Sequence, residues 1–389
     1  MKKILILMSD SGGGGHRASA DALRDAISEC YGAEVKVEMI DLWLDYTFPP
    51  LNQVPRGYRF LVDDAPWLYK LLYRVGEQPL AKEPLLRMAS RLLSRPIGQV
   101  LRTSAPDLIM SVHPLMQAVP LRILRRTHRD IPFVTVVTDF IDVHPVWFDK
   151  HVTLCCVPSE AAYGLALKAG LQPEQVRVFG LPIRPAFAKP ALPKATLRES
   201  LGLQRDLPCV LLVSGGEGMG RLAEITQEVT AALASDGQVR GQMVVICGRN
   251  ERLEQELVSH PWPIPMFAKG YVDNVWDWMA ACDVVITKAG PGTIAEALAM
   301  GLPILLCGYI PGQESANVPY VLKHGAGVFA EDPKMVAQVV SSWLGAERAV
   351  MEQFAERSAL LGRPQAAYQI VREAAGLMPG AERGAHVEG

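Results

Sequence analysis

The sequence lacks the features that mark several classes of protein. It has no run of about 18 apolar residues, so we expect no helix that crosses a bilayer. Its net charge is −2 over 389 residues, which gives no electrostatic reason to expect bulk nucleic-acid binding. It also has no Asp-x-Asp triplet, so a divalent metal that bridges a diphosphate is not indicated. We therefore expect a globular protein that needs no metal and no cofactor.

The seven cysteines form no Cys-x-x-Cys pair. Cys155, Cys156, Cys247 and Cys307 lie in apolar runs, where a free thiol behaves as a small buried hydrophobe. Disulfides and structural metals are therefore not expected, which is typical of cytoplasmic proteins. The apolar run at residues 4–8 is too short for a signal peptide and leads into a glycine loop, so it predicts a buried strand.

Short apolar runs alternate with amphipathic segments in two series. The first series predicts strands at residues 4–8, 35–40, 108–111, 133–138 and 153–157, and the second at 209–213, 242–247, 284–287 and 304–307. Segments such as 19–30 and 160–169 have helical periodicity. This alternation predicts an α/β protein with two Rossmann-like domains, each built on a parallel sheet.

A proline-rich segment at residues 181–193 suits a linker between the two domains. We predict a first domain at residues 1–186, a second at 200–348, closing helices at 349–377 and a disordered tail at 378–389. Parallel sheets bind ligands at the carboxyl ends of their strands. Two such sheets would face each other across a cleft.

The first candidate site follows the first strand, where Gly12–Gly15 precede His16. Glycines let backbone N–H groups approach a ligand, and the helix that follows directs its positive end to the same place. A neutral imidazole there can remove a proton from a hydroxyl, so His16 is the candidate catalytic base. The alternative is a flexible glycine loop with a capping histidine.

Three further polar residues follow predicted strands of the first domain. Asp139 ends one strand and is a candidate to orient the His16 imidazolium, or else a cap of a turn. His113 and Gln117 follow another strand and are candidate substrate contacts, although a buried structural histidine is equally consistent with the pattern at His113.

The second domain repeats the pattern. A glycine loop after its first strand suits a diphosphate, and an Ala-Gly-Pro-Gly-Thr turn opens a helix whose free N–H groups suit an anion. Glu296 on that helix can hold ribose hydroxyls or cap it, and Gln313 and Glu314 are expected to bind sugar hydroxyls. Lys288 and Arg184 are expected to stabilise a departing UDP. The predicted substrate-binding residues are Gly14, Gly15, His113, Gln117, Arg184, Gly215, Gly216, Gly218, Met219, Lys288, Gly290, Gly292, Thr293, Glu296, Gln313, Glu314 and Asn317.

These stretches resemble the monogalactosyldiacylglycerol synthase family. The motifs that carry the resemblance are SGGGGHRASA, DLWLDYTFPPLNQVPRGYRFLV, SVHPLMQAVPLRIL, GLPIRPAF, GGEGMG, TKAGPGTIAEA and PGQESANVPY. They extend over roughly residues 1–375. The chain is less closely similar to processive diacylglycerol glucosyltransferases and to the peptidoglycan transferase MurG.

The resemblance implies a GT-B glycosyltransferase with the acceptor domain first and the UDP-sugar domain second. It implies an inverting, metal-independent transfer of galactose from UDP-galactose to diacylglycerol, with UDP-glucose as the alternative donor. His16 would be the base, Glu296 would hold ribose, Gln313 and Glu314 the sugar, and the backbone near Val272 would read uracil. Glu314 stands where MurG has glutamine, which leaves the sugar open.

The resemblance also requires a membrane, and residues 55–102 suit an anionic surface. This segment interleaves aromatic and apolar residues from Trp67 to Tyr73 with nine basic residues, namely Arg56, Arg59, Lys70, Arg74, Lys82, Arg87, Arg91, Arg95 and Arg102. A solvated helical face over an ordinary core is the alternative. Because the first strand starts at residue 4, without a plant transit peptide, we expect a bacterial enzyme on the cytoplasmic face of the membrane.

Other functions explain less of the sequence. A sugar-nucleotide epimerase or a peptidoglycan transferase would not account for the lipid-type motif after residue 41. A non-catalytic membrane-binding paralogue would not need His16 and Glu296 to be intact. For a nicotinamide enzyme, Asp41 is an available ribose partner, but the second-domain motifs would then have no role. The oligomeric state is not predicted.

Overall fold

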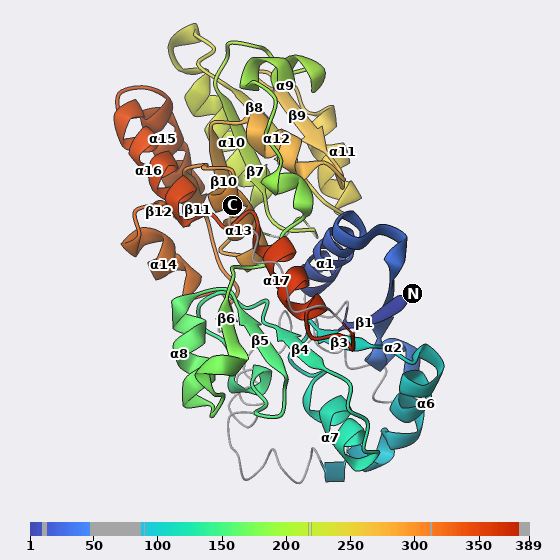
Figure 1. Cartoon of the computed structure of the whole chain (residues 1–389). Helices are drawn as coiled ribbons and strands as arrows, with labels where there is room; N and C mark the ends of the chain where they lie inside the picture. The colour runs from blue at the N-terminus through green and yellow to red at the C-terminus, as the bar shows by residue number, and fades with distance from the viewer. Residues whose placement is uncertain are drawn as a thin grey trace. The chain divides into compact units, whose positions relative to one another are not determined.

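The computed structural model of the chain describes residues 1–9, 14–46, 87–88, 90–216, 218, 220–311 and 313–380 (Figure 1). The chain divides into two compact units. The N-terminal unit contains Met1–Pro185 together with Gln365–Gly389, and the C-terminal unit contains Ala186–Pro364. The first unit is therefore built from two separate stretches of chain.

The described part of the N-terminal unit contains a parallel six-stranded sheet in the order β2-β1-β3-β4-β5-β6. Its strands are β1 (Lys2–Met8), β2 (Val35–Asp41), β3 (Leu108–Ser111), β4 (Phe133–Val136), β5 (Leu154–Val157) and β6 (Val176–Val178). Its helices are α1 (Gly15–Tyr31), α2 (Leu42–Tyr46), α6 (Ser94–Ser104), α7 (Ala118–Arg126), α8 (Glu160–Lys168) and α17 (Ala366–Ala375). In the register, Ile4 lies between Val37 of β2 and Leu108 of β3.

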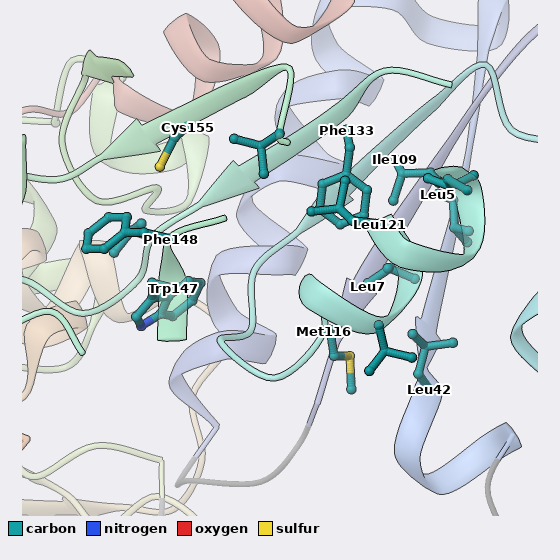
Figure 2. Close-up of a cluster of buried hydrophobic side chains, with 14 of the residues drawn as sticks. Leu5, Leu7, Leu42, Ile109, Met116, Leu121, Phe133, Trp147, Phe148 and Cys155 are labelled. Atoms are coloured by element: carbon teal, nitrogen blue, oxygen red, sulfur yellow. The ribbon is translucent and has the colours of Figure 1, made fainter. Parts of the chain in front are cut away.

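Successive side chains of β1 point to opposite faces of the sheet and pack in two separate hydrophobic cores. Ile4 and Ile6 pack on one face with residues of α1 and α17, whereas Leu5 and Leu7 pack on the other with residues of α6, α7 and α8. Figure 2 shows the second of these cores, with Phe133 and Trp147 among the side chains that fill it. Both faces of the sheet are covered, which explains why β1 is apolar at successive positions.

The described part of the C-terminal unit also contains a parallel six-stranded sheet, in the order β12-β11-β10-β7-β8-β9. Its strands are β7 (Cys209–Val213), β8 (Gln242–Ile246), β9 (Met266–Lys269), β10 (Val284–Thr287), β11 (Ile304–Leu306) and β12 (Gly327–Phe329). Its helices are α9 (Lys194–Ser200), α10 (Leu222–Leu233), α11 (Glu251–Ser259), α12 (Val275–Ala281), α13 (Pro291–Ala299), α14 (Asn317–Lys323), α15 (Pro333–Leu344) and α16 (Arg348–Leu361).

A buried ion pair fixes α9 to the amino ends of two central strands. Arg198, which is 6% exposed, donates to Asp283 at 2.5 Å and to the Ala281 carbonyl at 2.9 Å. The same Asp283 oxygen accepts the backbone N–H of Cys209 at 2.8 Å. Because each charged group has several partners, the pair can be buried without an uncompensated charge.

The α/β architecture is confirmed, and each predicted strand is present to within two residues at either end. Three strands were not predicted, namely β6, β9 and β12, and all are short edge strands of the two sheets. The predicted closing helices at 349–377 separate: α16 belongs to the C-terminal unit, and α17 packs with α1. Residues 381–389 of the predicted tail lie outside the described residues.

None of the helices that the structure describes is both long and apolar enough to pass through a bilayer.

A substitution at Gly327 can test how closely β12 packs against β11. A Cβ atom on Gly327 would lie 1.8 Å from the backbone oxygen of Ile304, so Gly327→Ala should destabilise the unit by about 1–3 kcal/mol or more. A Cβ atom on Gly164 of α8 would meet nothing within 4 Å, so Gly164→Ala should be neutral or stabilising, by up to about 1 kcal/mol. Urea unfolding of both variants measures this contrast, and equal effects would contradict it.

Candidate active site

His16 is the second residue of α1, which begins at Gly15. Gly14 occupies the N-cap position with φ of 82°, a left-handed conformation that glycine adopts without strain, and no side chain caps the helix. The imidazole is therefore held at the carboxyl end of β1 by the first turn of a helix. The other two glycines of the loop, Gly12 and Gly13, lie outside the described residues.

The ring of His16 has three close neighbours. Its Nδ1 atom lies 2.7 Å from Oγ1 of Thr138, which follows β4. The His113 ring meets it edge-on with centroids 4.6 Å apart, and the Trp147 ring lies 6.0 Å away. The residue nevertheless keeps partial exposure, so one side of it can be reached by a substrate.

Burial lowers the pKa of His16 to about 4, although a hydrogen bond with the Val112 carbonyl favours the protonated ring. Burial also lowers the pKa of His113 well below its ordinary value, and the neighbouring His16 lowers it further. Both rings are consequently neutral at pH 7. A neutral His16 has a free lone pair, which is the state that a general base requires.

We expected Asp139 to orient His16, but in the structure Asp139 has a different partner. Its Oδ2 atom accepts the indole N–H of Trp147 at 2.6 Å, and the Nδ1 atom of His16 faces Thr138 instead. Burial raises the pKa of Asp139 to about 6, an effect that the Trp147 hydrogen bond opposes. Among the described residues, Trp147 lies between Asp139 and the base, and the predicted catalytic role of Asp139 stays a prediction.

His113 and Gln117 are both buried, and His113 lies against the His16 ring. The Nδ1 atom of His113 accepts the Leu115 N–H at 3.2 Å, which leaves its proton on Nε2. Gln117 accepts a hydrogen bond from the Thr135 hydroxyl. Its Nε2 atom is buried without a partner among the described residues, so it is a donor that a substrate oxygen could satisfy.

In the C-terminal unit, Lys288 and Glu314 form a salt bridge at the carboxyl end of β10. The second oxygen of Glu314 accepts the Ile310 N–H at 2.9 Å, and the residue is 5% exposed. A Cβ atom on Gly290 would lie 2.9 Å from Nζ of Lys288, and one on Gly215 3.7 Å from its Cε. Four of the predicted donor-site residues are therefore close neighbours.

The helix α13 starts at Pro291, with Gly290 as its N-cap and no side chain that caps it. Thr293 lies inside the helix rather than at the cap, so a capping box between Thr293 and Glu296 is excluded. Glu296 is half-buried one turn further on. The uncapped N–H groups and the Lys288 ammonium make this end of the helix suited to an anion, and a side chain on Gly292 would meet nothing within 4 Å.

Asn317 and Gln313 complete this part of the unit. Asn317 donates to the Ala289 carbonyl at 2.9 Å, while its buried Oδ1 atom has no partner among the described residues. Gln313 is half-buried beside Glu314. An unpaired acceptor and an adjacent amide are suited to hydroxyl groups of a ligand.

The glycine loop after β7 is not open at every position, because part of it packs closely against neighbouring backbone. At Gly218, with φ of 57°, a Cβ atom would lie 2.1 Å from the Cys247 carbonyl oxygen, whereas at Gly216 it would meet nothing. Met219 lies outside the described residues. Val272 follows β9 and is half-buried, and Arg184 is half-buried at the end of the N-terminal unit.

Two contributors were not predicted from the sequence. Thr138 was passed over in favour of the adjacent carboxylate, and Trp147 had no sequence signal beyond being an aromatic residue after a polar turn. No group of three or more His, Cys, Asp or Glu side chains that could hold a metal ion is found in the part of the chain that the structure describes.

Solved structures with this architecture are glycosyltransferases and related sugar-nucleotide enzymes. MurG of Acinetobacter baumannii matches with a TM-score of 0.60 at 13% identity, covering 96% of this chain and 99% of that one. The S. aureus MnaA–UDP structure matches with a TM-score of 0.62 at 15% identity, covering 97% and 96%. The chain therefore has the GT-B fold, with two Rossmann-like domains.

Sequence comparisons define the family. The family model for monogalactosyldiacylglycerol (MGDG) synthase matches residues 16–183, and that for the glycosyltransferase family 28 C-terminal domain matches residues 210–367. Monogalactosyldiacylglycerol synthase 1 of Arabidopsis thaliana is 46% identical over 376 residues, which are 96% of this chain and 70% of that protein. The spinach (Spinacia oleracea) enzyme is 46% identical and is covered to 72%. The chain belongs to the monogalactosyldiacylglycerol synthase family and is a glycosyltransferase.

The expectation of a bacterial protein on the cytoplasmic membrane is wrong. The relatives from Arabidopsis thaliana, Nicotiana tabacum and Spinacia oleracea are all named as chloroplastic enzymes. The early start of the first strand was therefore a poor guide to location.

Two variants should change stability with opposite dependence on pH. An unfolded histidine titrates near 6.5 and folded His16 near 4, so the unfolded chain binds more protons between these values and stability falls as the pH falls through them. His16→Gln removes this loss, so its Tm should rise relative to the parent protein as the pH falls from 6.5 to 4.

For Asp139 the sign reverses. Its pKa rises from 3.8 to about 6 on folding, so the buried carboxylate costs stability as the pH rises through this window. Asp139→Asn, which keeps an acceptor for Trp147, should therefore gain Tm relative to the parent protein as the pH rises from 4 to above 6. Tm curves that run parallel to the parent protein at all pH values would contradict both assignments.

Proposed function

We propose that this chain transfers galactose from UDP-galactose to 1,2-diacylglycerol with inversion at the anomeric carbon and without a metal ion. The observation that carries the proposal is the 42–46% identity, over 96% of the chain, to proteins named as monogalactosyldiacylglycerol synthases. The motif residues on both units agree with it, because one unit supplies a neutral base and the other an anion site.

The acceptor reacts at His16. The ring takes the proton of the glycerol hydroxyl as the oxygen attacks the anomeric carbon, and the bond from that carbon to the diphosphate breaks on the opposite face. Gln117 supports acceptor binding, since its buried amide N–H has no partner among the described residues and suits an oxygen of the lipid. A base of this kind typically contributes on the order of 10² to 10⁴ in rate.

The leaving diphosphate is stabilised by the C-terminal unit. It takes both electrons of the broken bond, and its negative charge is met by the uncapped N–H groups of α13 and by Lys288. Fixed donors of this kind replace the divalent ion that other transferases use. Glu296 holds the ribose, and Gln313, Glu314 and Asn317 contact the sugar.

A product assay tests the reaction. Purified enzyme is incubated with diacylglycerol vesicles and either UDP-galactose or UDP-glucose, with and without EDTA, and the glycolipid is identified by mass and by the NMR coupling of its anomeric proton. We expect a β-galactolipid from UDP-galactose and an equal rate in EDTA. A glucolipid alone would replace the donor assignment, and loss of activity in EDTA would overturn metal independence.

His16→Ala should lower the transfer rate by on the order of 10² to 10⁴ because it removes the base that takes the proton of the glycerol hydroxyl. UDP affinity, measured by calorimetry, should be unchanged, since His16 is not one of the proposed nucleotide contacts. Turnover close to the parent rate would remove His16 from this role.

The proposed acceptor lies in a bilayer, and the N-terminal unit has a surface that suits one. Most of residues 55–102 lies outside the described residues, but Arg87, Arg91, Arg95 and Arg102 are exposed. The helix α7, which packs on α6, adds a further group of basic residues, namely Arg122, Arg125 and Arg126. Exposed Met88 and Leu92 lie among these cations. We infer that this surface contacts anionic lipid.

Charge neutralisation tests this surface. Each well-placed cation contributes about 1 kcal/mol, so Arg91→Gln with Arg95→Gln should weaken binding to vesicles that contain phosphatidylglycerol by about 30-fold at low salt. The matched control is Arg252→Gln with Lys334→Gln, two exposed cations of the C-terminal unit. Sedimentation with vesicles measures both, and equal losses, or binding that is insensitive to salt, would contradict the assignment.

A further inference from the structure

Thr138, rather than a carboxylate, is the hydrogen-bonding partner of the proposed base. Its Oγ1 atom lies 2.7 Å from Nδ1 of His16 and 3.5 Å from the carbonyl oxygen of Val112, to which the hydroxyl donates. The residue is buried, at 4% exposure, and it lies two residues after the end of β4. Among the described residues, no other side chain forms a hydrogen bond with the ring, and the Val112 carbonyl is its backbone partner.

The direction of these hydrogen bonds determines which ring nitrogen carries the proton. A hydroxyl has one proton, and when Thr138 donates it to the Val112 carbonyl, which can only accept, the lone pairs of Oγ1 are left to face His16. Only an Nδ1–H group can bond to a lone pair. Nε2 must then be the unprotonated nitrogen of the neutral ring.

We propose that Thr138 is a positioning residue that holds His16 as the Nδ1–H tautomer, so that Nε2 is the atom that accepts the proton of the acceptor hydroxyl. The catalytic part of this proposal rests on the proposed function. During transfer the hydroxyl proton moves to Nε2, Nδ1 keeps its own proton, and the resulting imidazolium donates to Oγ1 of Thr138. No proton passes to Thr138 itself.

The surroundings of the ring favour a neutral partner of this kind. His113 lies edge-on to His16 and itself carries its proton on Nε2, because its Nδ1 accepts the Leu115 N–H. Asp139 faces Trp147. A threonine orients the base without a charge, and this agrees with the low pKa of His16, which no adjacent carboxylate raises.

The tautomer can be observed directly in the free enzyme. Protein labelled with ¹⁵N-histidine gives two-bond ring correlations that distinguish Nδ1–H from Nε2–H, and His16→Gln identifies the His16 signals by their loss. We expect Nδ1–H in the parent protein and in Thr138→Ser, and loss of this single tautomer in Thr138→Val. A parent spectrum with the proton on Nε2 would overturn the proposal, whatever the enzyme's activity.

Kinetics then separates positioning from folding. Thr138→Val should lower kcat by on the order of 10²-fold with the KM for the donor unchanged, and Thr138→Ser should restore most of the rate. Thr230→Val is the matched control, because Thr230 is also a buried threonine, whose hydroxyl bonds only to carbonyls of its own helix. Equal losses in Thr138→Val and Thr230→Val, or no rescue by serine, would overturn the proposal.

If the parent protein transfers no sugar with any donor, the proposed function fails while the NMR result still decides the role of Thr138. If transfer is normal and the tautomer is Nε2–H, the role of Thr138 fails while the proposed function stands. The two hypotheses therefore fail separately.

Discussion

Every strand pair in both sheets is parallel, and this constraint determines where polar chemistry can gather. A parallel strand must be followed by a crossover, so the loops that leave the carboxyl ends all lie along one edge of the sheet. His16, His113 and Thr138 follow β1, β3 and β4, which are neighbours. Lys288 and Glu314 follow β10 and β11, which are also neighbours. The sites thus result from strand order, although their residues are far apart in the sequence.

Much of the fold was predictable because the central strands are buried on both faces and therefore read as continuous apolar runs. β3, β7 and β10 were predicted at their observed limits. The edge strands β6, β9 and β12 were not, because each is only partly buried and so lacks a continuous apolar run. Val176-Arg177-Val178 includes a charged residue, and β12 begins with a glycine. Strands of this kind form because the adjacent strand provides backbone hydrogen bonds, and the local sequence pattern does not reveal this partner.

The individual residues of the candidate site could be predicted from the sequence, but the pairs that they form with one another could not. His16 was identified because a histidine directly after four glycines has few structural explanations. Its partner was not, because the stronger acceptor in the adjacent pair Thr138-Asp139 was chosen. In the structure one oxygen of the Asp139 carboxylate accepts the indole N–H of Trp147, eight residues away, and the Nδ1 atom of His16 faces Thr138. The same holds for Lys288 and Glu314. Each was predicted to contact a ligand, and in the structure they form a salt bridge with each other.

The return of α17 to the N-terminal unit has a consequence for synthesis of the chain. The helix packs on α1, where Tyr368 donates to Glu29, and it buries Ile370 and Val371 in the core that covers one face of the first sheet. On the ribosome, the N-terminal unit therefore cannot be completed until α17 emerges, and the C-terminal unit, which is one continuous stretch, can close before it. A nascent chain arrested near residue 364 would carry an unfinished first domain with an apolar strip exposed, and it would be a natural substrate for chaperones.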